Sequence, residues 1–303
     1  MSRLAMLALV LTLGTVSSLA GAACSRAHAT TPVLHIIAAE NFYGDVARQI
    51  AGPDAQVTSI LSNPDQDPHL FEASPSVARA LTQATITISN GADYDPWMST
   101  LLVAAPADGR RDIVVASLMG AGTGSNPHLW YDPRTMKRLA RVFADALDKA
   151  DPQQKTSHDA ARDRFLASLA PIDARIEKIR RRFGDTLVTA TEPVFGLMSN
   201  ALGFVMRNER FQLAVMNNTE PRASDIAAFE NDLRGHRVSL LFYNSQASDS
   251  AARRLLDIAR HAGIPVVGVT ETEPLGQDYQ HWMMGELDAV DHVLSAHPQM
   301  AEP

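Results

Sequence analysis

The stretch Val33-Leu34-His35-Ile36-Ile37-Ala38 is followed by a second stretch, Phe42 to Ala51, in which the apolar residues are spaced differently. The first stretch is a nearly continuous apolar run, which is typical of a buried strand. The second has apolar residues at helical spacing and ends at Gly52-Pro53, a common stop signal for a helix. The sequence therefore predicts a strand–helix unit at residues 33–51, and the rest of the chain repeats this pattern.

Strand and helix patterns alternate along both halves of the chain. Further strands are predicted at 56–61, 84–89, 112–117, 186–191, 211–216, 237–243 and 264–270. Helices are predicted between them at 74–83, 95–104, 195–202, 224–233, 248–262 and 278–295, with another that begins at Asp132. Such alternation favours parallel sheets with helices on both faces. We therefore predict an α/β fold of two domains, each with a four-stranded, mostly parallel sheet flanked by helices.

A long helical pattern separates the two halves. It begins at Asp151-Pro152, reaches about Phe183, and should kink at Pro171. Its length makes it a stiff link rather than a flexible linker. The predicted division is a signal peptide at 1–29, an N-terminal α/β domain at 30–150, one long linking helix at 151–183 and a C-terminal α/β domain at 184–303.

The first 29 residues have the features of a targeting signal. Arg3 supplies a positive charge, Leu4 to Leu19 is apolar, and Ala27-His28-Ala29 is a cleavage signature. No later stretch has the roughly 20 apolar residues that a membrane helix needs. We expect a periplasmic protein exported by a cleavable signal peptide. A lipid anchor at Cys24 is the less favoured alternative, since Gly21-Ala22-Ala23-Cys24 resembles a lipoprotein cleavage box.

The composition excludes several classes of function. The chain has 303 residues, of which 46% are hydrophobic and 20% charged, as in globular proteins with real cores. The net charge is −7, and Arg180-Arg181-Arg182 is the one conspicuous basic run, so nucleic acid is not an expected partner. Cys24 is the single cysteine, which excludes a cysteine nucleophile and a thiolate zinc site.

Four polar side chains lie just past the carboxyl ends of predicted strands. His69 and His128 belong to the first half, and Glu192 and Glu271 to the second. Because parallel sheets bind ligands beyond the carboxyl ends of their strands, these residues can line one cleft between the domains. Two imidazoles and two carboxylates form a plausible site for a first-row divalent metal. The carboxylates would repel each other in a dry cleft unless a cation lay between them.

Both histidines follow a proline and stand close before a helix. The two motifs are Asp67-Pro68-His69-Leu70 and Asn126-Pro127-His128-Leu129. Proline fixes its own φ angle and restricts the residue before it, so each imidazole is carried on a stiff backbone. The repeated arrangement predicts that the two side chains share one target.

These motifs resemble those of the periplasmic solute-binding proteins of bacterial zinc and manganese ABC importers. Residues 67–76 look like the first ligand loop of that family and residues 126–133 like the second, and Asn90-Gly91-Ala92-Asp93-Tyr94 with Trp97 resembles its third-strand signature. The resemblance extends from about Val33 to the last helix. It implies a two-domain metal-binding protein that is not an enzyme.

The resemblance also implies the ligands and the partner. The cargo would be one divalent ion, Mn²⁺ or Zn²⁺ with Fe²⁺ as a further option, held by His69, His128, Glu192 and Glu271. The partner would be the membrane permease of an ABC metal importer, and we expect a monomer.

The acidic positions depart from the zinc-type pattern. Glu192 precedes Phe195-Gly196, where zinc-type members usually have a histidine and manganese-type members a glutamate. Glu271 stands where the family usually has an aspartate, and Glu273 is close enough to compete with it. This set favours manganese slightly, although Zn²⁺ binds nearly any such site more tightly than Mn²⁺. An exported zinc-dependent hydrolase and a metal-dependent adhesin or interaction protein stay open as alternatives.

Overall fold

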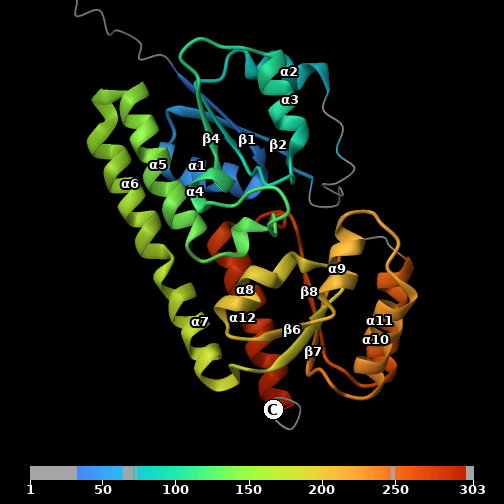
Figure 1. The fold of residues 1–303 in the computed structure, drawn as a ribbon. Helices are drawn as coiled ribbons and strands as arrows, with labels where there is room; N and C mark the ends of the chain where they lie inside the picture. Colours follow the sequence, from blue (N-terminus) through green and yellow to red (C-terminus); the bar gives the residue numbers. More distant parts are fainter. Residues whose placement is uncertain (1–32, 64–70, 72–73, 247–249, 298–303) are drawn as a thin grey trace, which may run out of the picture. The chain divides into compact units, whose positions relative to one another are not determined.

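The computed structural model describes residues 33–63, 71, 74–246 and 250–297. Within these ranges the chain forms two four-stranded sheets, and every paired strand in both is parallel (Figure 1). Helices flank both sheets. The predicted α/β fold with two four-stranded parallel sheets is confirmed. Among the described helices, none is both long and apolar enough to cross a membrane.

The first sheet has the strand order β2-β1-β3-β4. Its strands are β1 (Leu34–Glu40), β2 (Ala55–Leu61), β3 (Ile86–Ser89) and β4 (Arg111–Val114). The helices of this half are α1 (Asn41–Ala51), α2 (Pro75–Leu81), α3 (Pro96–Ala104), α4 (Val115–Met119) and α5 (Thr135–Ala150). Side chains of β1 alternate between the faces: Ile36 packs in a cluster with α1 and α5, and Ile37 in a cluster with α2 and α3.

The second sheet has the equivalent order β6-β5-β7-β8. Its strands are β5 (Leu187–Ala190), β6 (Val205–Arg207), β7 (Leu240–Asn244) and β8 (Val266–Val269). The helices of this half are α8 (Gly196–Ala201), α9 (Glu209–Met216), α10 (Ala223–Arg234), α11 (Ser250–His261) and α12 (Tyr279–Ala296). Leu241 packs in a cluster with α9, α10 and α11, whereas Leu240 and Phe242 face the largest cluster on the other side.

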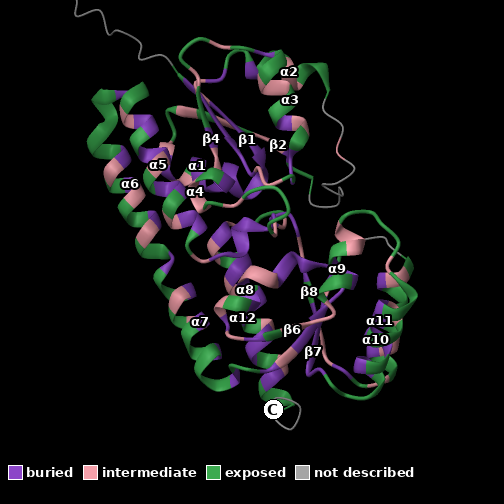
Figure 2. Cartoon of the chain, viewed as in Figure 1, coloured by how far each residue is buried: buried purple, intermediate pink, exposed green. Residues whose placement is uncertain are grey.

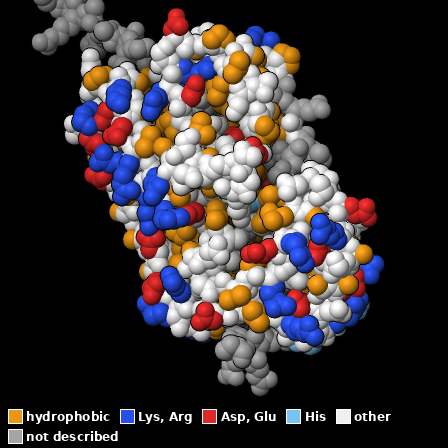
Figure 3. Space-filling model, in the orientation of Figure 1, with side chains coloured by type: hydrophobic (Ala, Val, Ile, Leu, Met, Phe, Trp, Pro, Cys, Tyr) orange, Lys and Arg blue, Asp and Glu red, His pale blue; other side chains and the backbone are white. Residues whose placement is uncertain are grey.

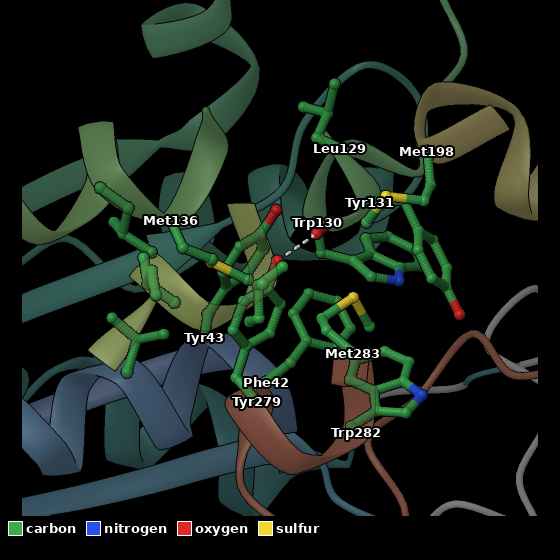
Figure 4. Packing of buried hydrophobic residues seen from close by; sticks show 14 of the residues in the cluster. Phe42, Tyr43, Leu129, Trp130, Tyr131, Met136, Met198, Tyr279, Trp282 and Met283 are labelled. Atoms are coloured by element: carbon green, nitrogen blue, oxygen red, sulfur yellow. Dashed lines mark hydrogen bonds between the residues drawn. The ribbon is translucent and has the colours of Figure 1, made fainter. Parts of the chain in front are cut away.

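The largest hydrophobic cluster contains residues from both sheets. It includes Ile36 of β1, Val188 of β5 and Trp282 of α12. Figure 2 shows that buried residues occur along both sheets and the helices beside them. At the centre of the cluster the Phe42 ring lies 4.5 Å from the Trp130 ring and 6.0 Å from the Trp282 ring, centroid to centroid (Figure 4). Buried aromatic pairs of this kind contribute beyond the area they bury. The two sheets therefore contribute to one core.

The segment between the sheets is helical, as predicted, but contains a break. After a short 3₁₀ turn, α6 (Lys155–Ser168) is followed by α7 (Ala170–Phe183), with only Leu169 between them. Leu169 keeps a helical conformation, with φ −82° and ψ −12°. Pro171 lacks an N–H and crowds the preceding turn, which explains why the helical segment is interrupted here. The domain boundaries at 150 and 184 stay a prediction.

Two predicted strands differ from the structure. The stretch 211–216 is not a strand: it belongs to α9, and the strand beside β5 is β6 at Val205–Arg207. Phe211, Leu213 and Val215 alternate as in a strand, yet Leu213 is exposed while Phe211 and Val215, one helical turn apart, join one cluster. The strand predicted at 112–117 ends at Val114, where α4 begins.

Candidate metal centre

His128 is held by its own loop. It precedes a 3₁₀ turn, Leu129–Tyr131, whose side chains are buried in the shared core, and it is itself 0% exposed. Asn126 Oδ1 accepts a hydrogen bond from the His128 backbone N (3.0 Å) and lies 2.7 Å from His128 Nδ1. Because Asn126 Nδ2 donates to Pro193 O (2.8 Å), the amide orientation is fixed and Nδ1 must carry the proton. The lone pair of the neutral ring therefore lies on Nε2.

The signature at residues 90–94 anchors the loop that carries His128. Asn90 follows β3, and its Nδ2 donates to Pro127 O at 2.9 Å. Its Oδ1 accepts from the hydroxyl of Tyr43 on α1 at 2.6 Å. The proline that precedes His128 is thus anchored to the first sheet, which explains why a motif after β3 accompanies a ligand loop after α4.

Glu271 faces His128 from the second sheet. It follows β8 and is 1% exposed. Its Oε2 lies 3.6 Å from His128 Nε2 and accepts a hydrogen bond from the Tyr94 hydroxyl at 3.2 Å. His128 Nε2 is a buried atom with no hydrogen-bond partner among the described residues. An imidazole lone pair and a carboxylate oxygen are both acceptors, so a shared cation would satisfy the two together.

Glu192 lies on the other side of Asn244. It follows β5, precedes the 3₁₀ turn Pro193–Phe195 and is 6% exposed. Asn244 ends β7, and its Nδ2 lies 2.6 Å from Glu271 Oε1 and 3.3 Å from Glu192 Oε1. One amide therefore joins two carboxylates that come from the ends of β5 and β8. Both lie at the carboxyl edge of the second sheet, where parallel sheets bind their ligands.

The structure places His128 beside Glu271 and links Glu271 to Glu192 through Asn244. The fourth predicted ligand, His69, lies outside the described residues. Within the part of the chain that is described, no group of three or more His, Cys, Asp or Glu side chains could hold a metal ion by itself. The four-residue ligand set stays a prediction, and the His128–Glu271 pair is its strongest support.

Glu273 has a different environment from Glu271. Its backbone N donates to Asn41 Oδ1 (3.1 Å), and its carbonyl accepts from Asn41 Nδ2 (2.7 Å). Burial raises the pKa of Glu273 to about 9, and the Asp45 carboxylate adds to the rise. Glu271 is the residue whose carboxylate lies 3.6 Å from His128 Nε2, and this geometry supports it over Glu273 as the ligand after β8.

Asn244 and Gln246 were not among the predicted site residues. Gln246 Oε1 accepts hydrogen bonds from the backbone N of Glu271 (2.5 Å) and of Thr272 (3.2 Å). Both residues stand at the carboxyl end of the strand predicted at 237–243, so the position that pointed to the glutamates also marks them. Tyr94 was noted only as part of a family signature, and its contact with Glu271 is a further finding.

Comparisons with known proteins agree with this fold. Residues 36–293 match the family described as zinc-uptake complex component A, periplasmic, and the chain belongs to that family. Its members are solute-binding components of metal transport, which confirms the resemblance seen in the sequence motifs.

Individual relatives resemble the chain over nearly its full length. The metal ABC transporter substrate-binding lipoprotein SloC of Streptococcus mutans is 23% identical over 295 residues, covering 90% of this chain and 94% of its own. The manganese ABC transporter substrate-binding lipoprotein PsaA of Streptococcus anginosus is 23% identical over 311 residues, covering 95% and 97%. The periplasmic zinc-binding protein TroA of Treponema pallidum has a similar fold, with a TM-score of 0.73 at 17% identity, covering 86% of this chain and 99% of that one.

Proposed function

We propose that this protein is an extracytoplasmic solute-binding protein. It captures one divalent transition-metal ion, Mn²⁺ or Zn²⁺, and delivers it to the membrane permease of an ABC importer. The observation that carries the proposal is the buried approach of His128 Nε2 to Glu271 Oε2, 3.6 Å apart, from the edges of two different sheets. Family membership and relatives named for manganese and zinc binding support the same function.

The proposed metal ligands suit a divalent transition-metal ion. A neutral imidazole and ionised carboxylates bind first-row divalent ions, and the ion offsets the repulsion between Glu192 and Glu271. His69 is proposed as the fourth ligand on the strength of its Pro-His motif. The ion would then touch both halves of the chain, and its binding would favour a conformation only by its differential affinity for it.

The proposed mode of action is capture and release without bond chemistry. Both sheets contribute to one hydrophobic cluster, and α12 packs against α1, α7 and β8. A core shared in this way resists a large hinge motion, so we propose that cargo enters through local movements of the ligand loops.

We further propose a monomer that is exported to the periplasm. Whether residues 1–29 are removed or Cys24 is lipidated would be decided by mass spectrometry of the mature protein.

Calorimetric titration of chelator-stripped protein with Zn²⁺ and Mn²⁺ tests the proposal. We expect one ion per chain for the native sequence. Affinity should fall at least about a hundredfold for His128→Ala and for Glu271→Gln, more than the usual loss on removing a residue that only supports a ligand. His261→Ala is the matched control, since His261 is exposed on α11. Native affinity in both site variants would refute the site, and elemental analysis of protein isolated from the periplasm would identify the cargo.

A further inference from the structure

Glu40 and Asp95 form a buried pair of carboxyl groups at the carboxyl edge of the first sheet. Glu40 ends β1 and is 0% exposed, and Asp95 follows β3 and is 2% exposed. Their side chains are hydrogen-bonded to each other. Two ionised carboxylates in contact would repel each other strongly in a buried place, so one of the two has to keep a proton.

The surrounding hydrogen bonds indicate which of the two keeps it. Asp95 Oδ2 accepts from Asn90 N and Asp95 Oδ1 from Gly91 N, both at 2.7 Å. Both oxygens of Asp95 are therefore acceptors, as in an ionised carboxylate. Within the described part of the chain, no N–H or O–H of another residue donates to either carboxyl oxygen of Glu40. Glu40 thus gains least from being ionised, and its protonated form has an O–H that can donate to Asp95.

Two tyrosines also face the pair, but their protons are used elsewhere. Tyr43 of α1 donates to Asn90 Oδ1 at 2.6 Å, and Tyr94, after β3, donates to Glu271 Oε2 at 3.2 Å. Burial raises the pKa of both tyrosines, so both are neutral near neutral pH. Burial, and after it the charge of Asp95, also raises the pKa of Glu40 well above its ordinary value.

The pair closes a turn that the backbone alone would not favour. Gly91, Ala92 and Asp93 have consecutive positive φ angles of 74°, 51° and 64°. Such angles are costly for the two residues that carry side chains, and they persist where the surrounding contacts enforce them. The Asp95 carboxylate supplies two of these contacts, because it accepts from the N–H groups of Asn90 and Gly91 at the start of the turn.

This turn reaches the proposed metal centre by two routes. Asn90 Nδ2 donates to the carbonyl oxygen of Pro127, the residue before His128, at 2.9 Å. At the other end of the turn, the Tyr94 hydroxyl donates to the carboxylate of Glu271. A shift of the turn would therefore move the His128 loop and remove a hydrogen bond from Glu271.

We infer that Glu40 keeps its proton and hydrogen-bonds to Asp95, and that this pair positions the turn at residues 90–94 for metal binding. The last step of the inference rests on the proposed function. Glu40 and Asp95 act through Asn90 and Tyr94, so their role is positioning. Glu40 works here as a neutral donor, although it stands at the end of a strand, where an anionic glutamate would also fit.

The test uses two variants and a matched control. Glu40→Gln carries no charge and keeps an N–H that can donate to Asp95. Asp95→Asn replaces one of the two acceptor oxygens by an amide nitrogen, which cannot accept from the backbone. Asp232→Asn is the control: Asp232 is also 2% exposed, and it holds Asn208, another residue with positive φ, after β6 of the second sheet. Chelator competition measures the dissociation constant for Zn²⁺, and urea denaturation of the metal-free protein measures stability.

Glu40→Gln should keep the native Zn²⁺ affinity, whereas Asp95→Asn should lower it about tenfold or more. The control should lower stability and leave the affinity unchanged. An equal loss of affinity in Glu40→Gln and Asp95→Asn would overturn the inference, because Glu40 would then act as an anion. Native affinity in Asp95→Asn would overturn the positioning role.

The pH dependence of unfolding tests the proton by itself. The folded protein keeps a proton on Glu40 that the unfolded chain releases above the ordinary pKa of 4.5, so native stability falls as pH rises. Relative to Glu40→Gln, the folding equilibrium constant of the native protein should fall about tenfold per pH unit between about pH 5 and about pH 7. Parallel curves would overturn the inference, and this comparison needs neither metal nor the Asp95 variant. If the native protein binds neither Zn²⁺ nor Mn²⁺, the proposed function fails, while the pH comparison still decides whether Glu40 holds a proton.

Discussion

His128 Nε2 and Glu271 Oε2 lie 3.6 Å apart, and each is held in place by a different amide. Asn126 holds the imidazole through Nδ1, and Asn244 holds the carboxylate through Oε1. Both proposed metal-binding atoms, His128 Nε2 and Glu271 Oε2, are therefore positioned before an ion binds. Such preorganisation spares the ion the cost of ordering its ligands on binding.

Asn126→Ala should weaken metal binding without touching a ligand. The variant loses the acceptor that keeps the proton on His128 Nδ1, so part of the population would carry the proton on Nε2 and could not bind. Loss of such a supporting hydrogen bond typically costs about 10- to 100-fold in metal affinity. Calorimetric titration with Zn²⁺ measures this. Asn217→Ala is the control, since Asn217 is exposed and, within the described part of the chain, its side chain donates to Leu213 O alone. Equal affinity in the two variants would contradict the assigned tautomer.

Removing the metal should lower the free energy of unfolding of the native sequence. It should have little effect on a variant that lacks one of the proposed metal ligands. An ion that binds only the native state raises the free energy of unfolding by about 2.7 kcal/mol when its free concentration is 100 times the dissociation constant. We expect Zn²⁺ to raise the midpoint of thermal unfolding of the native sequence and to have little effect on Glu271→Gln. Scanning calorimetry with and without a chelator measures both. A similar rise in both proteins would place the ion elsewhere.

Much of the fold follows from local sequence patterns. Continuous apolar runs such as 33–38 occur where a strand is covered on both faces, and the alternation with helices then requires parallel sheets. The strand predicted at 211–216 was wrong, because the spacing of Phe211, Leu213 and Val215 fits a strand as well as it fits helical turns. Asn208 decides between them: its left-handed conformation, with φ 61°, ends β6 and precedes α9. Its side chain bonds Thr189 and Asp232, contacts between distant segments that no local pattern reveals.

The site was predictable only in part for a similar reason. Strand ends and Pro-His motifs led to the prediction of His128, Glu192 and Glu271, which stays a prediction. They could not select Asn244, because an amide at a strand end has many structural roles, and its importance appears only when two carboxylates are seen on either side of it. The same holds for Tyr94, which reaches Glu271 across the two sheets.

Asp291 should be important for attaching α12 to α7. It is buried and accepts from Arg175 (2.8 Å), Lys178 (3.1 Å) and Arg182 (2.7 Å). Figure 3 shows basic and acidic side chains intermixed along the side of the molecule where Figure 1 places α6 and α7. Asp291→Ala would leave the three cations close together without this carboxylate, at a cost of about 1–3 kcal/mol in the free energy of unfolding. Urea denaturation measures the change.

The control for that experiment is a neighbour on the same helix. Asp288 pairs with Arg175 at 2.7 Å, but its side chain is 51% exposed, so solvent screens the pair. Asp288→Ala should cost less than about 1 kcal/mol. Equal losses in the two variants would mean that burial of Asp291 adds nothing to its ion pairs.

Glu286 should make the metal-free protein less stable as pH rises. It lies on α12, where its Oε1 accepts from Tyr131 (2.9 Å), Trp282 (3.0 Å) and the Thr270 backbone N (3.3 Å). Burial raises the pKa of Glu286 to about 8, although these hydrogen bonds act in the opposite direction. The native state therefore keeps a proton that the unfolded chain releases above about pH 4.5, and the associated stability is lost as pH rises toward 8.

Glu286→Gln removes this proton while keeping an acceptor oxygen for the same donors. Since each pKa unit corresponds to about 1.4 kcal/mol, the native sequence should lose on the order of 3 kcal/mol more than the variant between about pH 5 and about pH 8. Urea denaturation across this range measures the two slopes, and Glu177→Gln, at an exposed position of α7, should keep the native slope. Parallel curves for the native sequence and Glu286→Gln would show that Glu286 is already ionised in the folded protein. In that case its hydrogen bonds to Tyr131 and Trp282 would outweigh the cost of burying the charge.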